Sequence, residues 1–272
     1  MADPLAELTA LNLIQHLQVG EIWFSSSNRQ LNPLTRDPIR YWSQSDEDTI
    51  TLRILDRLEI KPSGVFIEFG VGDGRENNTL VLLAKGWRGI WIGGQEIVFE
   101  PAKDGRLDFR KAWINLENIK YIVDELIQKQ NLNPVDLVSL DLDGNDLHFT
   151  KLLLEGGLRP KVWIAEYNAR FPVGVDWTIP YNASHTWGGD DYWGASFSSF
   201  CKLFKEYGYF PVACSIIGAN IFFVQKSFES RFTDIPQDEN QIYQPPLHYL
   251  VPKWGHRASA KTLRLLTEKQ IF

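Results

Sequence analysis

The sequence predicts an α/β fold in which a mostly parallel sheet is covered by helices and completed by an antiparallel strand. Short apolar runs alternate with segments of helical periodicity through the middle of the chain, a pattern typical of parallel sheets with helices on both faces. Later in the chain, two apolar runs flank the sequence SIIG, which indicates an antiparallel hairpin at one sheet edge. With 272 residues and 44% hydrophobic content, the chain is long enough to bury one substantial core.

The individual elements follow from the same patterns. Strands are expected at residues 65–69, 89–92, 107–113, 135–140, 162–165, 210–213 and 220–224. Helices are expected at 78–85 and 116–130, and the second has apolar residues at helical spacing before Pro134 ends it. Together these elements predict a core domain over residues 61–226.

The N-terminal flank, residues 1–60, is predicted to be a helical extension. Apolar residues recur at helical spacing between positions 5 and 17, so an amphipathic helix is expected there. Such a helix would cover a site or join two subunits, so a homo-oligomer is one expectation. Further on, Ser45 and Asp48 resemble a capping box that opens a helix through Leu58.

The C-terminal flank and the composition restrict the class of protein. Residues 227–272 are rich in proline and predict an irregular wrap that ends in a short helix at 261–269. Cys201 and Cys214 lie in apolar surroundings without metal-type spacing, which predicts buried thiols in a reducing compartment. The net charge of -6 without a basic cluster argues against a nucleic-acid partner. No apolar stretch is long enough to span a bilayer and the start lacks signal-peptide features, so we expect a cytoplasmic protein with a small-molecule partner and no membrane partner.

A glycine-rich turn follows the first predicted strand, in the sequence VFIEFGVGDGRENNT. Ligands of open parallel sheets bind beyond the carboxyl ends of the strands, and glycines let the backbone approach a ligand closely. The spacing ExGxGxG differs from the dinucleotide pattern GxGxxG. An acid before the turn would repel a pyrophosphate and receive an ammonium group, which favours an amino-acid-bearing cofactor such as S-adenosylmethionine. A glycine-rich turn without any ligand is the alternative.

Six segments between residues 42 and 224 carry a resemblance to a known family. In order, they are SQSDEDTI, VFIEFGVGDGRENNT, GWRGIWI, VDLVSLDLDGNDLHF, PKVWIAEYNARFP and DDYWGASF. With these segments the chain resembles the FkbM-type branch of the class I S-adenosylmethionine-dependent methyltransferases. The resemblance implies a Rossmann-like class I methyltransferase fold with a seven-stranded sheet and a reversed final strand. Many members of this branch have no assigned substrate, so the resemblance implies more about fold and cofactor than about the reaction.

The resemblance also assigns a cofactor site. Its residues would be Glu68, Gly70, Gly72, Asp73, Gly74 and Asn78. In the family an acid at the end of the second strand takes the ribose hydroxyls, but this chain has Gly93 at that place. Gln95 or Glu96 would have to supply the missing contact, and Gln95 is the residue that we expect there. If neither does so, the protein has kept the fold and lost or altered the cofactor.

A second polar constellation is DLDGND, which follows the strand expected at 135–140. Asp141 and Asp143 belong to it, while Glu166 and Asn168 follow the next strand. Neighbouring parallel strands deliver their ends to one edge, and clustered oxygen ligands suit a hard cation such as magnesium. The arrangement is similar to that of metal-dependent O-methyltransferases, where the ion holds a substrate diol and lowers the pKa of one hydroxyl. Alternatively, these residues cap the next helix and stabilise the turn.

Methyl transfer to an oxygen also needs a base, because a neutral alcohol is a poor nucleophile. His185 is the candidate, since it lies in the polar and aromatic loop NASHTWGGDDYWG after the fifth strand. Such loops offer contact area for sugars and flat rings. His148 is the rival base, and an exposed histidine without a catalytic role is the alternative for His185.

These patterns predict a methyltransferase that uses S-adenosylmethionine, acts on an oxygen of a polyhydroxylated or sugar-containing small molecule, and is assisted by a divalent cation. Two other classes stay open. Asp141 and Asp143 also match the DxD of metal-dependent nucleotide-sugar glycosyltransferases, which leaves the glycine turn unexplained. A non-catalytic binding protein of the same fold is favoured by Gly93 and by the lack of an obvious lysine base.

Overall fold

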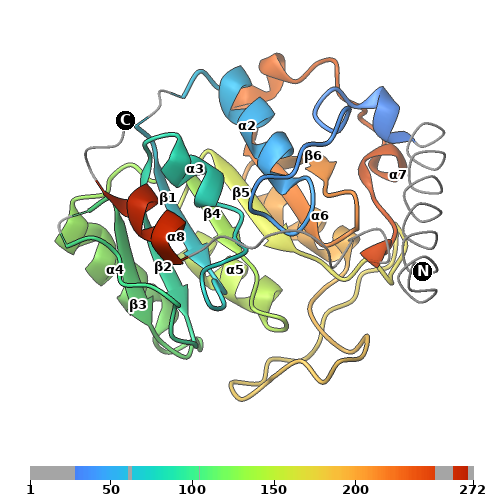
Figure 1. Cartoon of the computed structure of the whole chain (residues 1–272). Coiled ribbons are helices and arrows are strands. Elements are labelled where there is room, and N and C mark those ends of the chain that lie inside the picture. The colour runs from blue at the N-terminus through green and yellow to red at the C-terminus, as the bar shows by residue number, and fades with distance from the viewer. Residues whose placement is uncertain (1–27, 61–62, 104, 249–259, 269–272) are drawn as a thin grey trace, which may run out of the picture.

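The computed structural model describes residues 28–60, 63–103, 105–248 and 260–268 of the chain (Figure 1). Its centre is a seven-stranded sheet with the strand order β3-β2-β1-β4-β5-β7-β6. The strands are β1 (Val65–Phe69), β2 (Arg88–Gly93), β3 (Leu107–Lys111), β4 (Leu137–Leu140), β5 (Val162–Glu166), β6 (Tyr209–Cys214) and β7 (Asn220–Gln225). The first five strands pair in parallel, whereas β7 runs antiparallel to both β5 and β6. The predicted α/β, Rossmann-like architecture is therefore confirmed.

Helices cover both faces of this sheet. One apolar cluster joins the β1 residues Val65, Ile67 and Phe69 to α4 (Ile119–Gln130), α5 (Asp146–Glu155) and α6 (Phe197–Glu206). The other joins Phe66 to α2 (Glu47–Arg57), α3 (Leu80–Ala84) and α8 (Ala260–Thr267). Because successive strand residues point to opposite faces, Glu68 shares the α3 side with Phe66. The remaining short helices are η1 (Asn28–Leu31), η2 (Lys226–Arg231) and α7 (Glu239–Ile242).

The expected hairpin and buried thiols are also present. Gly218 N–H donates to the Ser215 carbonyl at 3.0 Å, which closes the turn between β6 and β7 within the SIIG sequence. Cys201 and Cys214 are buried free thiols. Within the described ranges, no helix combines the length and apolar character needed to cross a membrane.

Helix α2 begins in a different way from the expected capping box. Its N-cap residue is Asp46, which makes no side-chain cap bond. The Asp48 carboxylate instead accepts the backbone N–H groups of residues 41–43 at 2.8 to 2.9 Å, and the Ser45 hydroxyl donates to Glu47. The capping-box prediction is wrong because the chain upstream of the helix occupies Asp48.

The described part of the N-terminal flank is tied to β6. Arg29 donates to the Cys214 carbonyl at 2.7 Å and pairs with Asp46 inside the protein. The Asn32 amide donates to the Val212 carbonyl at 2.7 Å. The helix expected between positions 5 and 17 lies outside the described residues. At the other end, α8 agrees closely with the short helix expected at 261–269.

A long loop connects β5 to α6 and extends beyond the carboxyl ends of the strands, as the gold segment at the lower edge of Figure 1 shows. One isolated bridge between Thr178 and Ala195 holds its two arms together. The loop therefore lies at the edge where the ligands of such sheets bind.

Candidate functional site

Two loops meet at the carboxyl edge of the sheet, one after β1 and one after β4. Their strands are direct neighbours, and Gly70 lies directly against the backbone of Asp141. A Cβ atom at Gly70 would lie 1.5 Å from the Asp141 carbonyl oxygen, and Gly70 also has a φ of +80°. Only glycine fits there, so this position brings the glycine-rich turn and the acidic turn together.

The other two glycines of the turn have different surroundings. Gly74 has a φ of +85°, and a Cβ atom there would approach Trp91, Ile97 and Phe99 at 3.2 to 3.3 Å. Gly72 also has a left-handed φ, of +52°, but nothing lies within 4 Å of its Cβ position. The backbone at Gly72 is therefore open to a ligand.

Glu68 is used by the chain itself. Its carboxylate accepts the backbone N–H groups of Asn78 at 2.8 Å and Thr79 at 3.1 Å, and also the Thr79 hydroxyl. Burial raises the pKa of Glu68 to about 7, although these hydrogen bonds oppose the rise. Both carboxylate oxygens therefore serve the N-terminal end of α3, which begins at Leu80 and not at the expected residue 78.

The remaining predicted cofactor residues are placed as follows. Asp73 pairs with Arg75, whose Nε lies 2.8 Å from its carboxylate, and the Asn78 amide donates to the Ser139 hydroxyl at 3.1 Å. Gln95 is exposed. Their roles toward a cofactor stay predictions.

The packing explains why β2 ends in glycine instead of an acid. A Cβ atom at Gly93 would lie 2.9 Å from a methyl carbon of Val71. A side chain at this position would therefore require the Val71 side chain to move. Glu96 does not replace it, because it pairs with Lys111 at 2.7 Å on the exposed surface.

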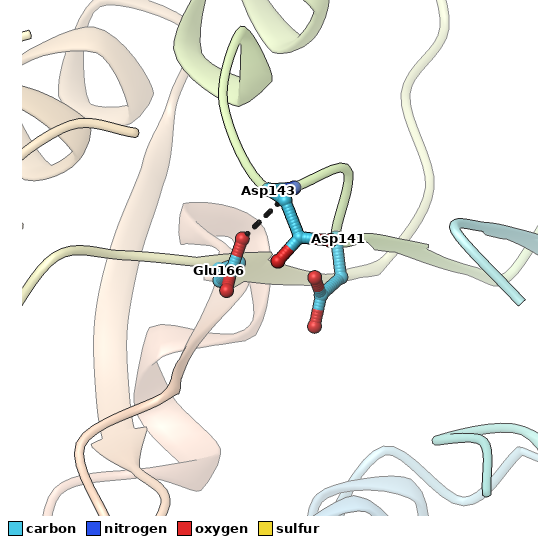
Figure 2. A group of neighbouring side chains, drawn as sticks. All are labelled: Asp141, Asp143 and Glu166. Atoms are coloured by element: carbon cyan, nitrogen blue, oxygen red, sulfur yellow. Dashed lines mark hydrogen bonds between the residues drawn. The ribbon is translucent and has the colours of Figure 1, made fainter. Parts of the chain in front are cut away.

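Three carboxylates gather at the ends of β4 and β5. One oxygen from each of Asp141, Asp143 and Glu166 lies within 4.8 Å of the others, and Figure 2 shows the three side chains facing a common point. The backbone N–H of Asp143 donates to Glu166 at 3.2 Å. We call these three residues the carboxylate trio.

Asp146 shapes the turn that presents this trio. It is fully buried at the start of α5, and its carboxylate accepts the N–H groups of Leu142 at 2.7 Å and Gly144 at 2.8 Å. Asp143 adopts a left-handed φ of 57° between them. Asp146 thus has the turn-stabilising role that was the alternative to metal binding, whereas within the trio the one backbone bond that the described residues show is that from Asp143 N–H to Glu166.

The electrostatics of the trio favour a proton or a cation. Burial and then repulsion by Asp143 raise the pKa of Asp141 well above its ordinary value, and burial and then repulsion by Asp141 do the same to Glu166. Because these two carboxyls are buried side by side, each disfavours the ionisation of the other. Burial also raises the pKa of Asp143, and the nearby His185 opposes that rise. A divalent cation could replace these protons, since oxygen ligands of this kind suit magnesium.

Asn168, the fourth predicted ligand, has other partners. Its buried amide nitrogen donates to the carbonyls of Asp191 and Trp193, both at 2.9 Å, and its oxygen accepts Arg170 N–H at 3.1 Å. Asn168 therefore fastens the long loop to the end of β5. These bonds favour a structural role over metal binding.

The structure places His185 beside the acidic turn. A Cβ atom at Gly144 would lie only 2.2 Å from Cδ2 of the His185 ring. Its Nε2 is buried and has no hydrogen-bond partner among the described residues. The rival base, His148, has its Nε2 at 2.8 Å from the Ile179 carbonyl, so its ring helps to hold the loop.

Sequence reasoning missed a buried polar pair that lies near the end of β5. Asn220 pairs with Glu166 across β7 and β5, and its amide donates to Glu47 at 3.3 Å. Glu47 is completely buried. The acids of SQSDEDTI predicted the start of a helix. Helical periodicity, however, gives no information about the partner of Glu47, because Asn220 lies 173 residues later in the chain.

No protein-family model and no curated protein matches the chain.

Proposed function

We propose that this protein is an S-adenosylmethionine-dependent methyltransferase that acts on an oxygen of a polyhydroxylated or sugar-containing small molecule, with assistance from a divalent cation such as magnesium. The observation that carries the proposal is the contact between Gly70 and Asp141. It joins an open glycine-rich turn to the carboxylate trio at one sheet edge. The resemblance to FkbM-type methyltransferases supports the choice of cofactor, and the proposed location is the cytoplasm.

The residues at this edge fit the cofactor in part. Gly72 leaves the backbone open for the methionine portion. At the ribose end, Gly93 offers no side chain, so Gln95 would have to supply the contact with the hydroxyls. S-adenosylmethionine would supply the methyl group.

The acceptor hydroxyl would be prepared by the chain's own acids and by His185. The carboxylate trio would hold the cation against the substrate oxygens, which lowers the pKa of a bound hydroxyl. The buried Nε2 of His185 has no hydrogen-bond partner among the described residues. It would accept the proton as the oxygen attacks.

Two other functions are favoured by particular observations. The proximity of Asp141 and Asp143 is also what a metal-bound nucleotide sugar requires in a glycosyltransferase. The use of both Glu68 oxygens by the chain is what a non-catalytic protein of this fold would show.

Calorimetric titration separates these functions. The protein is titrated with S-adenosylmethionine and with a uridine-diphosphate sugar, each with and without magnesium. Binding of S-adenosylmethionine is expected and would justify a screen of hydroxylated acceptors with radiolabelled methyl donor. Magnesium-dependent binding of the nucleotide sugar alone would identify a glycosyltransferase, and binding of neither would favour the non-catalytic protein.

A glycine substitution tests the open turn directly. Gly72→Leu should lower the affinity for S-adenosylmethionine by roughly 100-fold, because a side chain would fill the space beside the backbone. Gly157→Leu is the matched control, since Gly157 also has a left-handed φ, of +91°, and open space around its Cβ position. It follows α5 at the opposite end of the sheet. Equal affinity in both variants would contradict the assignment of Gly72.

A further inference from the structure

The loop that carries His185 is attached directly to the acidic turn. The side-chain amide of Asn145 donates to the Asn182 carbonyl at 2.8 Å, and Asn182 N–H donates back to the Asn145 side-chain oxygen at 3.1 Å. Asn145 is buried. This reciprocal pair joins the residue before α5 to a loop position 37 residues later.

Asn182 also forms hydrogen bonds within the segment that leads to His185. Its carbonyl also accepts the backbone N–H of His185 at 2.9 Å, and its side-chain oxygen accepts Ser184 N–H at 3.0 Å. Asn182 therefore folds residues 182–185 into a tight turn. The histidine lies at the end of that turn, three residues from the anchored position.

A second element restrains the same turn from the other side. Trp113 Nε1 donates to the Ala183 carbonyl at 2.8 Å, and the Tyr181 hydroxyl accepts Leu116 N–H at 3.0 Å. The segment after β3 and the turn after β4 thus hold residues 181–185 between them. The backbone that carries His185 is fixed although much of this loop is exposed.

Gly144 makes room for the ring. A Cβ atom there would lie 2.2 Å from Cδ2 and 2.9 Å from Nε2 of His185. Gly144 is outside the left-handed region, so its backbone conformation does not require glycine. The contact with the imidazole is the reason for a missing side chain at this position.

We infer that Asn145 and Gly144 are positioning residues that set the imidazole of His185 beside Asp143, Asn145 by holding the loop through Asn182 and Gly144 by leaving space for the ring. The inference rests on the proposed function for its effect on methyl transfer, but the restraint on the ring can be measured without any substrate. Neither residue carries an acid or a base. They act by fixing where Nε2 lies, and a misplacement of about 1 Å can reduce a rate by about 100-fold.

The first experiment measures the ring itself in the full-length protein with isotopically labelled histidine. The chain has five histidines, and the His185→Ala variant identifies the nuclear magnetic resonance signals of the His185 imidazole. Gly144→Ala should shift those signals and leave those of the other histidines unchanged. Gly188→Ala is the matched control, because it changes a glycine in the same loop whose Cβ position contacts only Asp190, at 3.8 Å. Unchanged His185 signals in Gly144→Ala would overturn the inference.

The second experiment measures catalysis. Gly144→Ala should lower kcat by about 100-fold with little change in the KM for S-adenosylmethionine, which is the pattern of a misplaced catalytic group. The double variant Gly144→Ala/His185→Ala should be no slower than His185→Ala alone, because the contact disappears with the ring. Multiplying effects in the double variant would show that Gly144 acts independently of His185 and would overturn the inference.

Asn145→Ala provides an independent check of the anchor. It removes two partly buried hydrogen bonds, so its fold is first compared with the wild type by thermal unfolding. The folded variant should shift the His185 signals as Gly144→Ala does, and unshifted signals would overturn the role of Asn145. If the wild-type protein transfers no methyl group, the proposed function fails, while the signals of His185 still decide the positioning role.

Discussion

The turn after β1 and the acidic edge formed by the ends of β4 and β5 lie in contact, yet Glu68 and Asp73 in the first have surroundings opposite to those of the carboxylate trio in the second. In the first turn, Glu68 accepts backbone N–H groups and Asp73 pairs with Arg75. In the second, Asp141 and Glu166 face each other and Asp143. An acid with its own donors belongs to the fold, whereas acids that repel one another are kept at the expense of stability. The second arrangement is therefore the one that supports the proposed cation site.

The largest effect is expected from neutralising the trio. The double variant Asp141→Asn/Glu166→Gln should lose affinity for Mg²⁺ or Mn²⁺ by roughly 100-fold or more, since two of three charged ligands become neutral. The same variant should have a higher unfolding temperature than the wild type. Its free energy of unfolding should rise by ~1 kcal/mol, because the repulsion among the three carboxylates is relieved. Calorimetry and thermal unfolding measure the two quantities.

Asp124→Asn is the control for that variant, because it removes an acid from an exposed pair with Lys120. It should change neither quantity appreciably. If Asp141→Asn/Glu166→Gln lowered the stability and left the cation affinity unchanged, the trio would be structural like Glu68, and the distinction drawn above would be wrong.

The opposite outcome is expected in the turn after β1. Glu68→Ala should destabilise the protein by ~3 kcal/mol, because it leaves two buried backbone N–H groups and a hydroxyl without an acceptor. Chemical denaturation measures this. Glu76→Ala, which removes a partly exposed partner of Arg40, should cost less than about 1 kcal/mol. Equal losses in the two variants would mean that Glu68 does not hold α3.

A smaller effect should appear as a pH dependence of stability. The pKa of Glu68 is raised from 4.5 to about 7 in the folded protein, so the fold binds its proton more tightly than the unfolded chain does. The resulting stabilisation is complete below about pH 4.5 and is lost as pH rises through about 7. Unfolding free energy should therefore fall by ~2.5 kcal/mol from this group between pH 5 and pH 8.

The Glu68→Gln variant isolates this contribution. The pKa of Asp146 is also raised to about 7 by burial. Asp146 therefore adds its own decrease in unfolding free energy over the same pH range, and this decrease remains in the variant. Denaturation curves of Glu68→Gln should show a flatter pH dependence than those of the wild type. Identical curves would contradict the assignment of the proton to Glu68.

The strands could be predicted from the sequence because a buried parallel sheet needs continuous apolar runs, and the run at 65–69 matches β1 without any shift. The meeting of Asp141 and Glu166 followed from strand adjacency alone. Asn168 and Asp48 were harder to predict. Each has a side chain that suits several roles, and the choice depends on backbone groups that only the folded chain brings near.

The hydrogen bonds between the N-terminal flank and the hairpin of β6 and β7 have a consequence for folding during synthesis on the ribosome. Arg29 and Asp46 find their partners at Cys214 and Ile216, which lie 185 and 170 residues later. At a synthesis rate of about 5–20 residues per second, the partners of these early residues are synthesised about 9 to 37 s after them. A nascent chain that stops before β6 would expose Asp46 and Glu47 without the bonds that they make in the finished fold.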